Sequence, residues 1–182
     1  MIVNIIVSHC KNNGIGKNNG LLWKCETRKL TTGNKNNAVI MGRKTYESIE
    51  NINGLNNRDN LILSKSLIID KLNGKNIVKS FKNSNALEDF VKLKNYDELW
   101  VIGGQQIYKL FLDNYEQGQS IFNINKIIIT YIDKEFECDT YFPDLKEYTE
   151  KHNLYFYSKT IVKVNDSKNI DYNSYEIIYK YL

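Results

Sequence analysis

The sequence is poor in the residues that build disulfide frameworks and metal sites. Its three cysteines, Cys10, Cys25 and Cys138, are scattered over 182 residues, form no CxxC pair and lack a zinc-ligand spacing, which is typical of free thiols in a reducing compartment. The two histidines, His9 and His152, are too few and too isolated to build a metal site. We therefore expect no metal. With 42% hydrophobic residues the chain can bury a sizeable core without one.

Long apolar runs and a strong charge of one sign are also missing. The N-terminal run, residues 2–7, lacks a basic leader and is too short to span a bilayer, so we expect a buried first strand and a cytoplasmic protein. The net charge is only +4, and the lysines are dispersed. This excess would favour an anionic small molecule but gives weak support for nucleic-acid binding. The single proline carries no functional assignment.

Apolar runs alternate with helical patterns along most of the chain, which predicts an α/β fold with a mostly parallel sheet covered on both faces. Late strands without helices between them predict an antiparallel edge. No composition shift, repeat or long linker marks a second domain, so one domain over residues 1–182 is expected. The patterns predict strands at 1–9, 38–42, 60–64, 76–80, 98–102, 125–132, 154–164 and 172–181, and helices at 26–32, 43–49, 84–94 (with Ser84 as N-cap) and 105–114.

Ligands of open α/β sheets bind beyond the carboxyl ends of the strands, so the residue runs after each predicted strand are candidate binding sites. After the first strand, a glycine-rich stretch, 14–20, leads into the apolar segment 21–23. Its GxGxxxG spacing and the aromatic-ended loop that follows argue against a Rossmann dinucleotide loop. A glycine-rich surface turn is the simpler interpretation. An apolar tip on a mobile loop could instead fold over a ligand and exclude water.

Three further strand ends carry glycine or basic residues. Residues 42–45 read Gly-Arg-Lys-Thr, Ser64 and Lys65 follow the third strand, and Gly103-Gly104 separates a buried strand from a helix. Glycine lets the backbone approach a phosphate, while the helix N-terminus and the cations attract its charge. These ends would suit a phosphorylated adenosine and a pyrophosphate. A random basic surface and a common Gly-Gly pair are the alternatives.

Glu26 is a carboxylate just after the apolar loop tip, with Leu30 one turn along on the same predicted helix face. An apolar pocket would raise its pKa and suit it to acid/base work or to binding a protonated heterocycle. The alternative is a solvated glutamate favoured by the helix dipole. Thr130 could orient such a carboxylate and Arg58 could clamp a substrate carboxylate, although a strand threonine and a surface arginine need no function.

Five motifs occur in the order, and at nearly the spacings, of the dihydrofolate reductase family, and the chain resembles that family from residue 2 to about 143, with closing strands that are compatible. The motifs are Gly14-Ile-Gly-x-x-x-Gly-x-x-Trp23, Val39-Ile-Met-Gly-Arg-Lys-Thr-Tyr46, Arg58-x-Asn60 followed by Leu63-Ser64, Ile102-Gly-Gly-x-x-Ile-Tyr108, and Thr130 followed by Asp139-Thr-x-Phe-Pro143.

The resemblance implies a fold and an activity. The implied fold is a central, mostly parallel eight-stranded sheet with an antiparallel C-terminal edge strand and about four flanking helices. The implied activity is hydride transfer from NADPH to C6 of 7,8-dihydrofolate with protonation at N5, which gives tetrahydrofolate for one-carbon metabolism and thymidylate synthesis. Dihydrofolate and antifolate inhibitors are the expected ligands of a monomer that binds neither nucleic acid nor membrane.

The same resemblance implies a role for each candidate residue on the substrate side. Glu26 would pair with the ring nitrogen and 2-amino group of the pterin, with Thr130 in the same network. Trp23 would lie near the acid through water, and Tyr108 near the acid and the nicotinamide. The remaining contacts would be the backbone carbonyls of Ile6 and Ile102, the apolar walls formed by Val7, Leu30, Ile49 and Leu55, and Arg58 on the α-carboxylate of the glutamate tail.

For the cofactor, the resemblance implies four groups of residues, and Gly103-Gly104 is the expected cis peptide bond. Arg43, Ser64 and Lys65 would contact the 2′-phosphate, Lys44 and Thr45 the pyrophosphate, and Gly16, Asn19 and Leu21 would belong to the loop over the nicotinamide. The helix start Gly103, Gly104, Gln105 and Ile107 would form the second phosphate site, and the other expected contacts are Ser8, Ile15, Gly20, Gly42, Leu63, Ile102, Gln106 and Tyr108.

Three departures from the family pattern shape these assignments. The stretch from Trp23 to Gly42 is about two residues short, and counting back from Gly42 places Glu26, the only carboxylate between Val7 and Glu47, on the acid. Leu22 replaces the usual proline, which should loosen the loop. Residues 115–123 form an insertion that is expected to bulge at the surface, because loop insertions cost little stability.

Three rival functions are weaker. A reductase of the same fold that acts on a riboflavin-pathway pyrimidine with a ribityl phosphate would not need both Glu26 and Arg58, which together favour a pteroyl-glutamate. A catalytically silent NADPH-binding module predicts a missing acid or a degraded cofactor site, and the sequence shows neither. A basic nucleic-acid binder would cluster its cations with aromatic residues.

Overall fold

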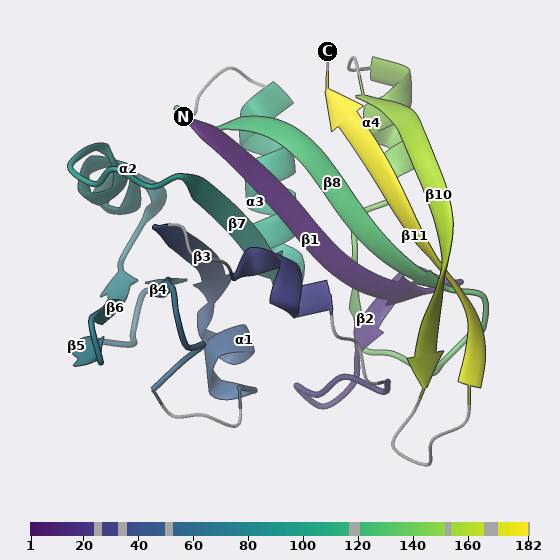
Figure 1. Ribbon diagram of the computed structural model, residues 1–182, viewed down its shortest axis with the longest axis horizontal. Coiled ribbons are helices and arrows are strands. Elements are labelled where there is room, and N and C mark those ends of the chain that lie inside the picture. The colour runs from purple at the N-terminus through teal and green to yellow at the C-terminus, as the bar shows by residue number, and fades with distance from the viewer. Residues whose placement is uncertain are drawn as a thin grey trace.

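The computed structural model describes residues 1–23, 27–32, 36–49, 53–116, 121–151, 154–165 and 171–181. These residues form a mixed sheet with helices on both faces (Figure 1). In chain order the elements are β1 (Ile2–Cys10), β2 (Gly14–Gly16), the 3-10 helix η1 (Thr27–Thr31), β3 (Asn37–Gly42), α1 (Arg43–Glu47), β4 (Asp59–Leu63), β5 (Asp70–Asn73), β6 (Asn76–Phe81), α2 (Ser84–Lys92), β7 (Glu98–Gly103), α3 (Gln105–Glu116), β8 (Asn123–Ile132), β9 (Thr140–Tyr141), α4 (Leu145–Lys151), β10 (Leu154–Asn165) and β11 (Asp171–Tyr181).

The main sheet confirms the predicted mostly parallel arrangement and its antiparallel C-terminal edge. Its strand order is β10-β11-β8-β1-β7-β3-β4-β6-β5, and β8, β1, β7, β3, β4 and β6 run parallel to their neighbours within that series. The described strands number nine in this sheet, not the expected eight, because β5 joins β6 through a tight turn at Gly74. The polar sequence Asp-Lys-Leu-Asn of β5 gives little strand signal, since it lies on an edge.

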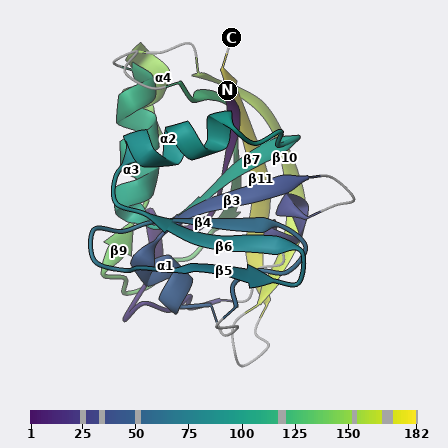
Figure 2. The same ribbon diagram turned by 90° about the vertical axis from the view of Figure 1, so that its left-hand side faces the viewer.

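The central strands are buried on both faces, which explains their continuous apolar runs. Alternate residues of β1 enter different apolar layers. Val3, Ile5 and Val7 pack in the layer that contains Leu87 of α2, whereas Ile6 packs in the layer that contains Tyr46 of α1. Helices α2 and α3 thus cover one face of the sheet and α1 the other (Figure 2). None of the described helices is long and apolar enough to cross a membrane.

Several predicted boundaries need correction. Helix α2 is capped by Asn83, not by Ser84: its extended backbone lets the side-chain oxygen accept from the N–H of Ala86 at 2.9 Å. The helices predicted at 43–49 and 84–94 end earlier, at Glu47 and Lys92. The helix predicted at 26–32 is the 3-10 helix η1, and its predicted first residue, Glu26, lies outside the described residues.

Besides β5, three elements were not predicted. Strands β2 and β9 are short and pair with each other, so each lacks the length that gives a periodic signal. Helix α4 follows Pro143 and Asp144, and the carboxylate of Asp144 accepts from the N–H of Lys146 at 3.0 Å. An N-cap aspartate followed three residues later by a glutamate, here Glu147, is a helix-start signal, so α4 could have been predicted from the sequence.

The expectation of a surface bulge at 115–123 is wrong at the C-terminal end of this segment. Helix α3 continues to Glu116 and β8 begins at Asn123; residues 117–120 lie outside the described residues. Phe122 is only 3% exposed, and its ring lies 5.3 Å from that of Phe111 on α3. The C-terminal end of the insertion is therefore part of the core.

Replacing Phe122 with alanine should lower the free energy of unfolding by about 3 kcal/mol, because it removes a buried ring and leaves a cavity against α3. Urea unfolding followed by circular dichroism measures this change. The control is Ile68→Ala at a side chain that is 87% exposed, which should change stability by less than about 0.5 kcal/mol. Equal effects of the two substitutions would contradict a core role for the insertion.

Candidate functional site

A cavity of about 890 Å³ opens at the carboxyl edge of the parallel strands. Its wall combines the ends of β1, β3, β4 and β7 with the first residues of α1 and α3 and with the loop after β1. Five consecutive parallel pairings place these strand ends on one edge, so segments that are far apart in the sequence share one wall. The volume is within the range of small-molecule and cofactor sites.

Nearly every residue that the sequence assigns to the cofactor lies in this wall; the exception is Gly103. The wall also contains residues that sequence reasoning missed. Lys82, Asn83 and Ser84 follow β6 as Ser64 and Lys65 follow β4, so the strand-end rule could have found them. The other additions are Lys17, Ser48, Leu110, Asp139 and Thr140.

The peptide bond between Gly103 and Gly104 is cis, as expected. Gly103 has φ +111°, and a Cβ there would come within 3.0–3.1 Å of the Tyr108 ring and hydroxyl, so glycine is required on both counts. The backbone N–H groups of Ile107 and Tyr108 donate to the carbonyl of Gly104 at 2.9 and 3.0 Å, which starts α3 directly at the cavity. This places a helix N-terminus, with its partial positive charge, in the wall.

The residues assigned to the substrate are only partly in the same wall. Ile6, Val7 and Ile102 line the cavity. Ile49 and Leu55 instead pack against the apolar layer under α1, and Leu30 is 46% exposed. Glu26 lies outside the described residues.

A chain of hydrogen bonds links three of the candidate residues. The indole N–H of Trp23, a buried side chain, donates to Ser8 Oγ at 2.7 Å, and that hydroxyl donates to the carbonyl of Thr130 at 3.3 Å. The Tyr108 hydroxyl donates to the carbonyl of Ile6 at 2.8 Å. A carbonyl has two lone pairs, so Ile6 can still accept from a ligand. Thr130 is fully buried on β8 opposite Ser8.

Arg58 is not a surface arginine. It is 7% exposed, its guanidinium donates to the hydroxyl of the fully buried Thr31, and its Nε donates to the carbonyl of Asn56 at 3.0 Å. These contacts hold the guanidinium beside η1, and Arg58 is not among the residues that line the cavity.

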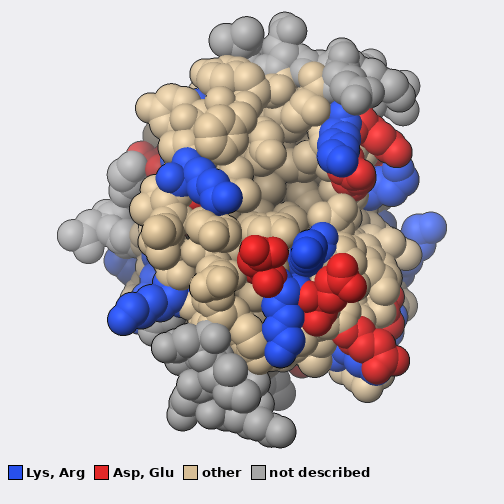
Figure 3. All heavy atoms as spheres, turned by 90° about the vertical axis from the view of Figure 1, so that its right-hand side faces the viewer, with Lys and Arg blue, Asp and Glu red and all other residues tan. Residues whose placement is uncertain are grey.

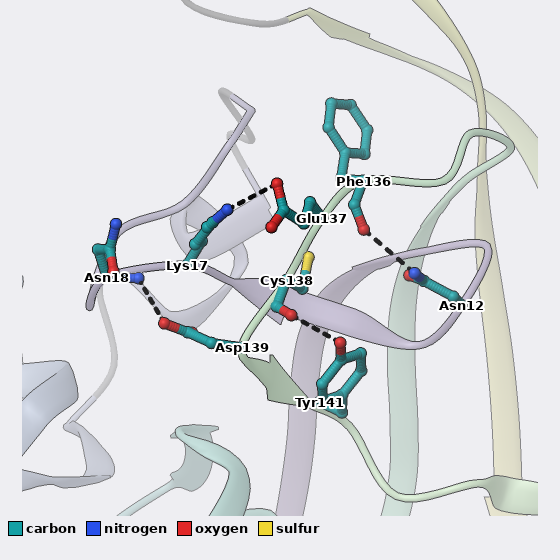
Figure 4. Close-up of polar contacts among 8 residues, drawn as sticks. All are labelled: Asn12, Lys17, Asn18, Phe136, Glu137, Cys138, Asp139 and Tyr141. Atoms are coloured by element: carbon teal, nitrogen blue, oxygen red, sulfur yellow. Dashed lines mark hydrogen bonds and ion pairs between the residues drawn. The ribbon is translucent and has the colours of Figure 1, made fainter.

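The loop over the cavity is fastened to the segment that precedes and includes β9 (Figure 4). Asp139 makes two contacts with the loop: its carboxylate accepts from the N–H of Asn18 at 2.8 Å, and its own N–H donates to the carbonyl of Gly16 at 3.1 Å. Lys17 pairs with Glu137 at 2.8 Å, and Asn12 donates to the carbonyl of Phe136 at 3.1 Å. We call this line of contacts, between residues 12–18 and 136–141, the loop seam.

Electrostatics at the loop seam favour the ionised form of Asp139. The N–H of Asn18 and then the hydroxyl of Thr140 lower the pKa of this carboxyl group below its ordinary value. Because the pKa of Asp139 is lower in the folded state than in the unfolded state, the seam contact contributes its full stability at pH values above the ordinary carboxyl pKa. It is lost as the pH falls through the lowered value.

Neutral side chains lie beneath the loop seam. Burial lowers the pKa of His9, which stacks on Phe142 with 5.9 Å between the ring centroids. Burial, followed by the nearby thiol of Cys10, raises the pKa of Cys138 to about 11. Cys10 and Cys138 are free thiols whose sulfur atoms lie 3.9 Å apart. Within the described ranges, no three His, Cys, Asp or Glu side chains are grouped to hold a metal ion.

Charges on the face that carries β10 are mixed: Figure 3 shows lysines and arginines beside aspartates and glutamates, not a field of one sign. Such a face gives no electrostatic footprint for a nucleic acid.

Fold and cavity together define an α/β protein with a cofactor-sized site at the carboxyl edge of a mostly parallel sheet. The sequence model of the dihydrofolate reductase family matches residues 2–177. Similar proteins include the dihydrofolate reductase of Gallus gallus, 33% identical over 183 positions that cover 93% of this chain and 92% of that protein. The Sus scrofa enzyme is 36% identical over 160 positions (80% and 82%) and the Schistosoma mansoni enzyme 36% over 157 (79% and 78%). The chain belongs to the dihydrofolate reductase family.

Removing the carboxylate of Asp139 should open the loop seam. In Asp139→Ala we expect trypsin to cleave after Lys17 about fivefold faster than in the wild type, because cleavage requires the loop to leave its docked position. Limited proteolysis with mass spectrometry of the fragments measures this rate. The exposed Glu147 on α4 provides the control, and Glu147→Ala should cleave at the wild-type rate. If Asp139→Ala also does so, this carboxylate does not hold the loop.

Proposed function

We propose that this protein catalyses the NADPH-dependent reduction of 7,8-dihydrofolate to 5,6,7,8-tetrahydrofolate. The observation that carries the proposal is the wall of the carboxyl-edge cavity, which collects the strand-end residues expected at the cofactor from four separate motifs. Membership of the dihydrofolate reductase family, whose members generally use NADPH, supports the same activity.

The described residues fit a phosphorylated dinucleotide. Gly42 and Gly104, at the starts of α1 and α3, both line the cavity. A Cβ at Gly42 would lie 3.1 Å from Ile107 and one at Gly104 would lie 3.3 Å from Thr45 Oγ1, so larger side chains would fill the cradle between the two helices. The helix starts and the cations beside them, such as Lys44, would hold the phosphates.

A bound NADPH would supply the hydride, and the chain's own residues would place it and exclude water. The loop that contains Ile15, Gly16 and Leu21 lines the cavity and is fastened by the loop seam. Closing this side of the site keeps bulk water from the reacting atoms and strengthens the interactions inside.

The second task is to hold the pterin and deliver a proton to N5. Glu26 is our candidate for the carboxylate, because it is the only one between Val7 and Glu47. Thr130 and the chain of hydrogen bonds through Ser8 and Trp23 lie at the end of β1 where a pterin would meet the cofactor. Arg58 would bind the α-carboxylate of the glutamate tail. We also propose a cytoplasmic monomer on which antifolates compete for the pterin end.

Turnover and the role of Glu26 can be tested together. The wild type should consume NADPH when dihydrofolate is added, and Glu26→Ala should lose about 10²-fold to 10⁴-fold in kcat, the usual contribution of a general acid or base. Absorbance at the NADPH band measures the rate, with Glu147→Ala as the control that retains wild-type kinetics. No turnover by the wild type would refute the activity; an unimpaired Glu26→Ala would refute the placement of the acid.

Choice between NADPH and NADH should depend on the cations at the end of β4 and the start of α1. Lys65→Ala should raise KM for NADPH by about tenfold, since a charge-assisted contact to the 2′-phosphate is lost. Its kcat/KM with NADH should stay within about twofold, and the effect on NADPH should shrink at high salt. The control is Lys109→Ala, which removes an exposed lysine paired with Asp113 on α3. Equal losses with both cofactors would place Lys65 elsewhere.

A further inference from the structure

Asn60 ties the loop between α1 and β4 to the sheet. Its side chain is fully buried. The amide oxygen accepts from the N–H of Leu55 at 2.8 Å, and the amide nitrogen donates to the carbonyl of the same residue at 2.9 Å and to the carbonyl of Arg58 at 3.0 Å. One side chain thus holds both polar backbone groups of Leu55 and one of Arg58.

The backbone of Asn60 is well anchored. It lies in β4 and pairs in register with Val39 on one side and Val78 on the other, in the parallel part of the sheet. Both valines are fully buried in the apolar layer against which Leu55 packs. A buried amide in such a layer would be costly if its groups were unpaired, so its three hydrogen bonds to the loop fix the loop's position.

The turn that precedes Leu55 leaves room for the amide of Asn60. Gly54 has φ +78°, and a Cβ there would lie 2.7 Å from the Asn60 side-chain oxygen. Glycine at this position allows the chain to reverse close enough for Asn60 to reach Leu55. The contact therefore depends on two residues: Gly54, which has no side chain to obstruct the turn, and Asn60, whose amide forms the hydrogen bonds.

Of the two residues that Asn60 holds, Arg58 is the one that we assign to the glutamate tail, and Leu55 is one of those that we assign to the apolar walls around the substrate. Arg58 is then held further by Asn56 and by the hydroxyl of Thr31. A planar guanidinium binds a carboxylate well only when its orientation is set in advance, because a loosely held fork loses the bidentate geometry.

We propose that Asn60 is a positioning residue that sets Leu55 and Arg58 for the aminobenzoyl-glutamate part of the substrate. It acts through the loop 54–58 and does not touch the reacting atoms. The inference rests on the proposed function. It adds that preference for a glutamate-bearing pterin over a pterin without a tail depends on this amide.

The test compares two substrates in steady-state kinetics with NADPH. Dihydrofolate carries the tail, whereas 6-methyl-7,8-dihydropterin offers the same reacting bond without it. In Asn60→Ala we expect KM for dihydrofolate to rise about tenfold, the effect of losing one well-oriented charged contact. The kcat for dihydrofolate and the kcat/KM for the tail-less pterin should stay within about twofold.

Three further variants separate positioning from simple destabilisation. Asn4 is a buried asparagine near the N-terminal end of β1, away from the cavity, and its side chain accepts from Asn125 at 3.0 Å. Asn4→Ala should leave the ratio of the two kcat/KM values unchanged. In an Arg58→Ala background, Asn60→Ala should change that ratio less than it does in the wild type, because one of the two positioned groups is gone. If Asn60→Ala does not fold, as judged by NADPH binding, Asn60→Ser decides with the same readouts.

The outcomes are distinct. A folded Asn60 variant that keeps the wild-type ratio, or that loses both substrates equally, overturns the positioning role. A wild type that oxidises NADPH with neither substrate refutes the proposed function instead. A selective rise in KM for dihydrofolate supports the inference.

Discussion

The parallel hydrogen-bonded pairing of β1 with β7 and β8 is the constraint on which the rest of the structure depends. It places three buried strands side by side at the centre of the sheet with their carboxyl ends on one edge. The starts of α1 and α3, and the loop after β1, then converge on the same side because each follows a strand of this parallel set. The cavity is thus a consequence of strand direction, and its chemistry is a consequence of which residues come first after each strand.

How much of this could be predicted depends on whether the signal is local. Some features can be recognised from a few consecutive residues: the buried strands, Gly103-Gly104 and the basic strand ends. The structure brings them together. The burial of Arg58 could not be predicted, because it depends on a hydroxyl 27 residues away. The burial of Phe122 could not be predicted either, because the ring that it packs against, on Phe111, lies outside the inserted segment. Edge strand β5 lacks an apolar pattern because a polar edge needs none.

The site is organised by two kinds of fastening. Around the end that we assign to the cofactor, glycines and helix starts leave space, and the backbone itself forms the wall. Around the end that we assign to the substrate tail, buried polar side chains such as Thr31 and Asn60 fix the position of a loop. A wall formed by backbone atoms tolerates changes in the neighbouring side chains. An amide side chain that pairs with three backbone groups tolerates almost no substitution.

The loop seam joins residues that are separated by 121 positions in the chain, such as Asn18 and Asp139. Such contacts cannot form until β8 has docked on β1, because the seam begins where these two strands end. Its hydrogen bonds are mostly exposed, so the seam belongs to the low-stability end of the molecule. The loop over the cavity and the segment around β9 should therefore detach as one cooperative unit, while the sheet beneath them stays folded. The motion that admits ligands would then be a small, reversible piece of local unfolding.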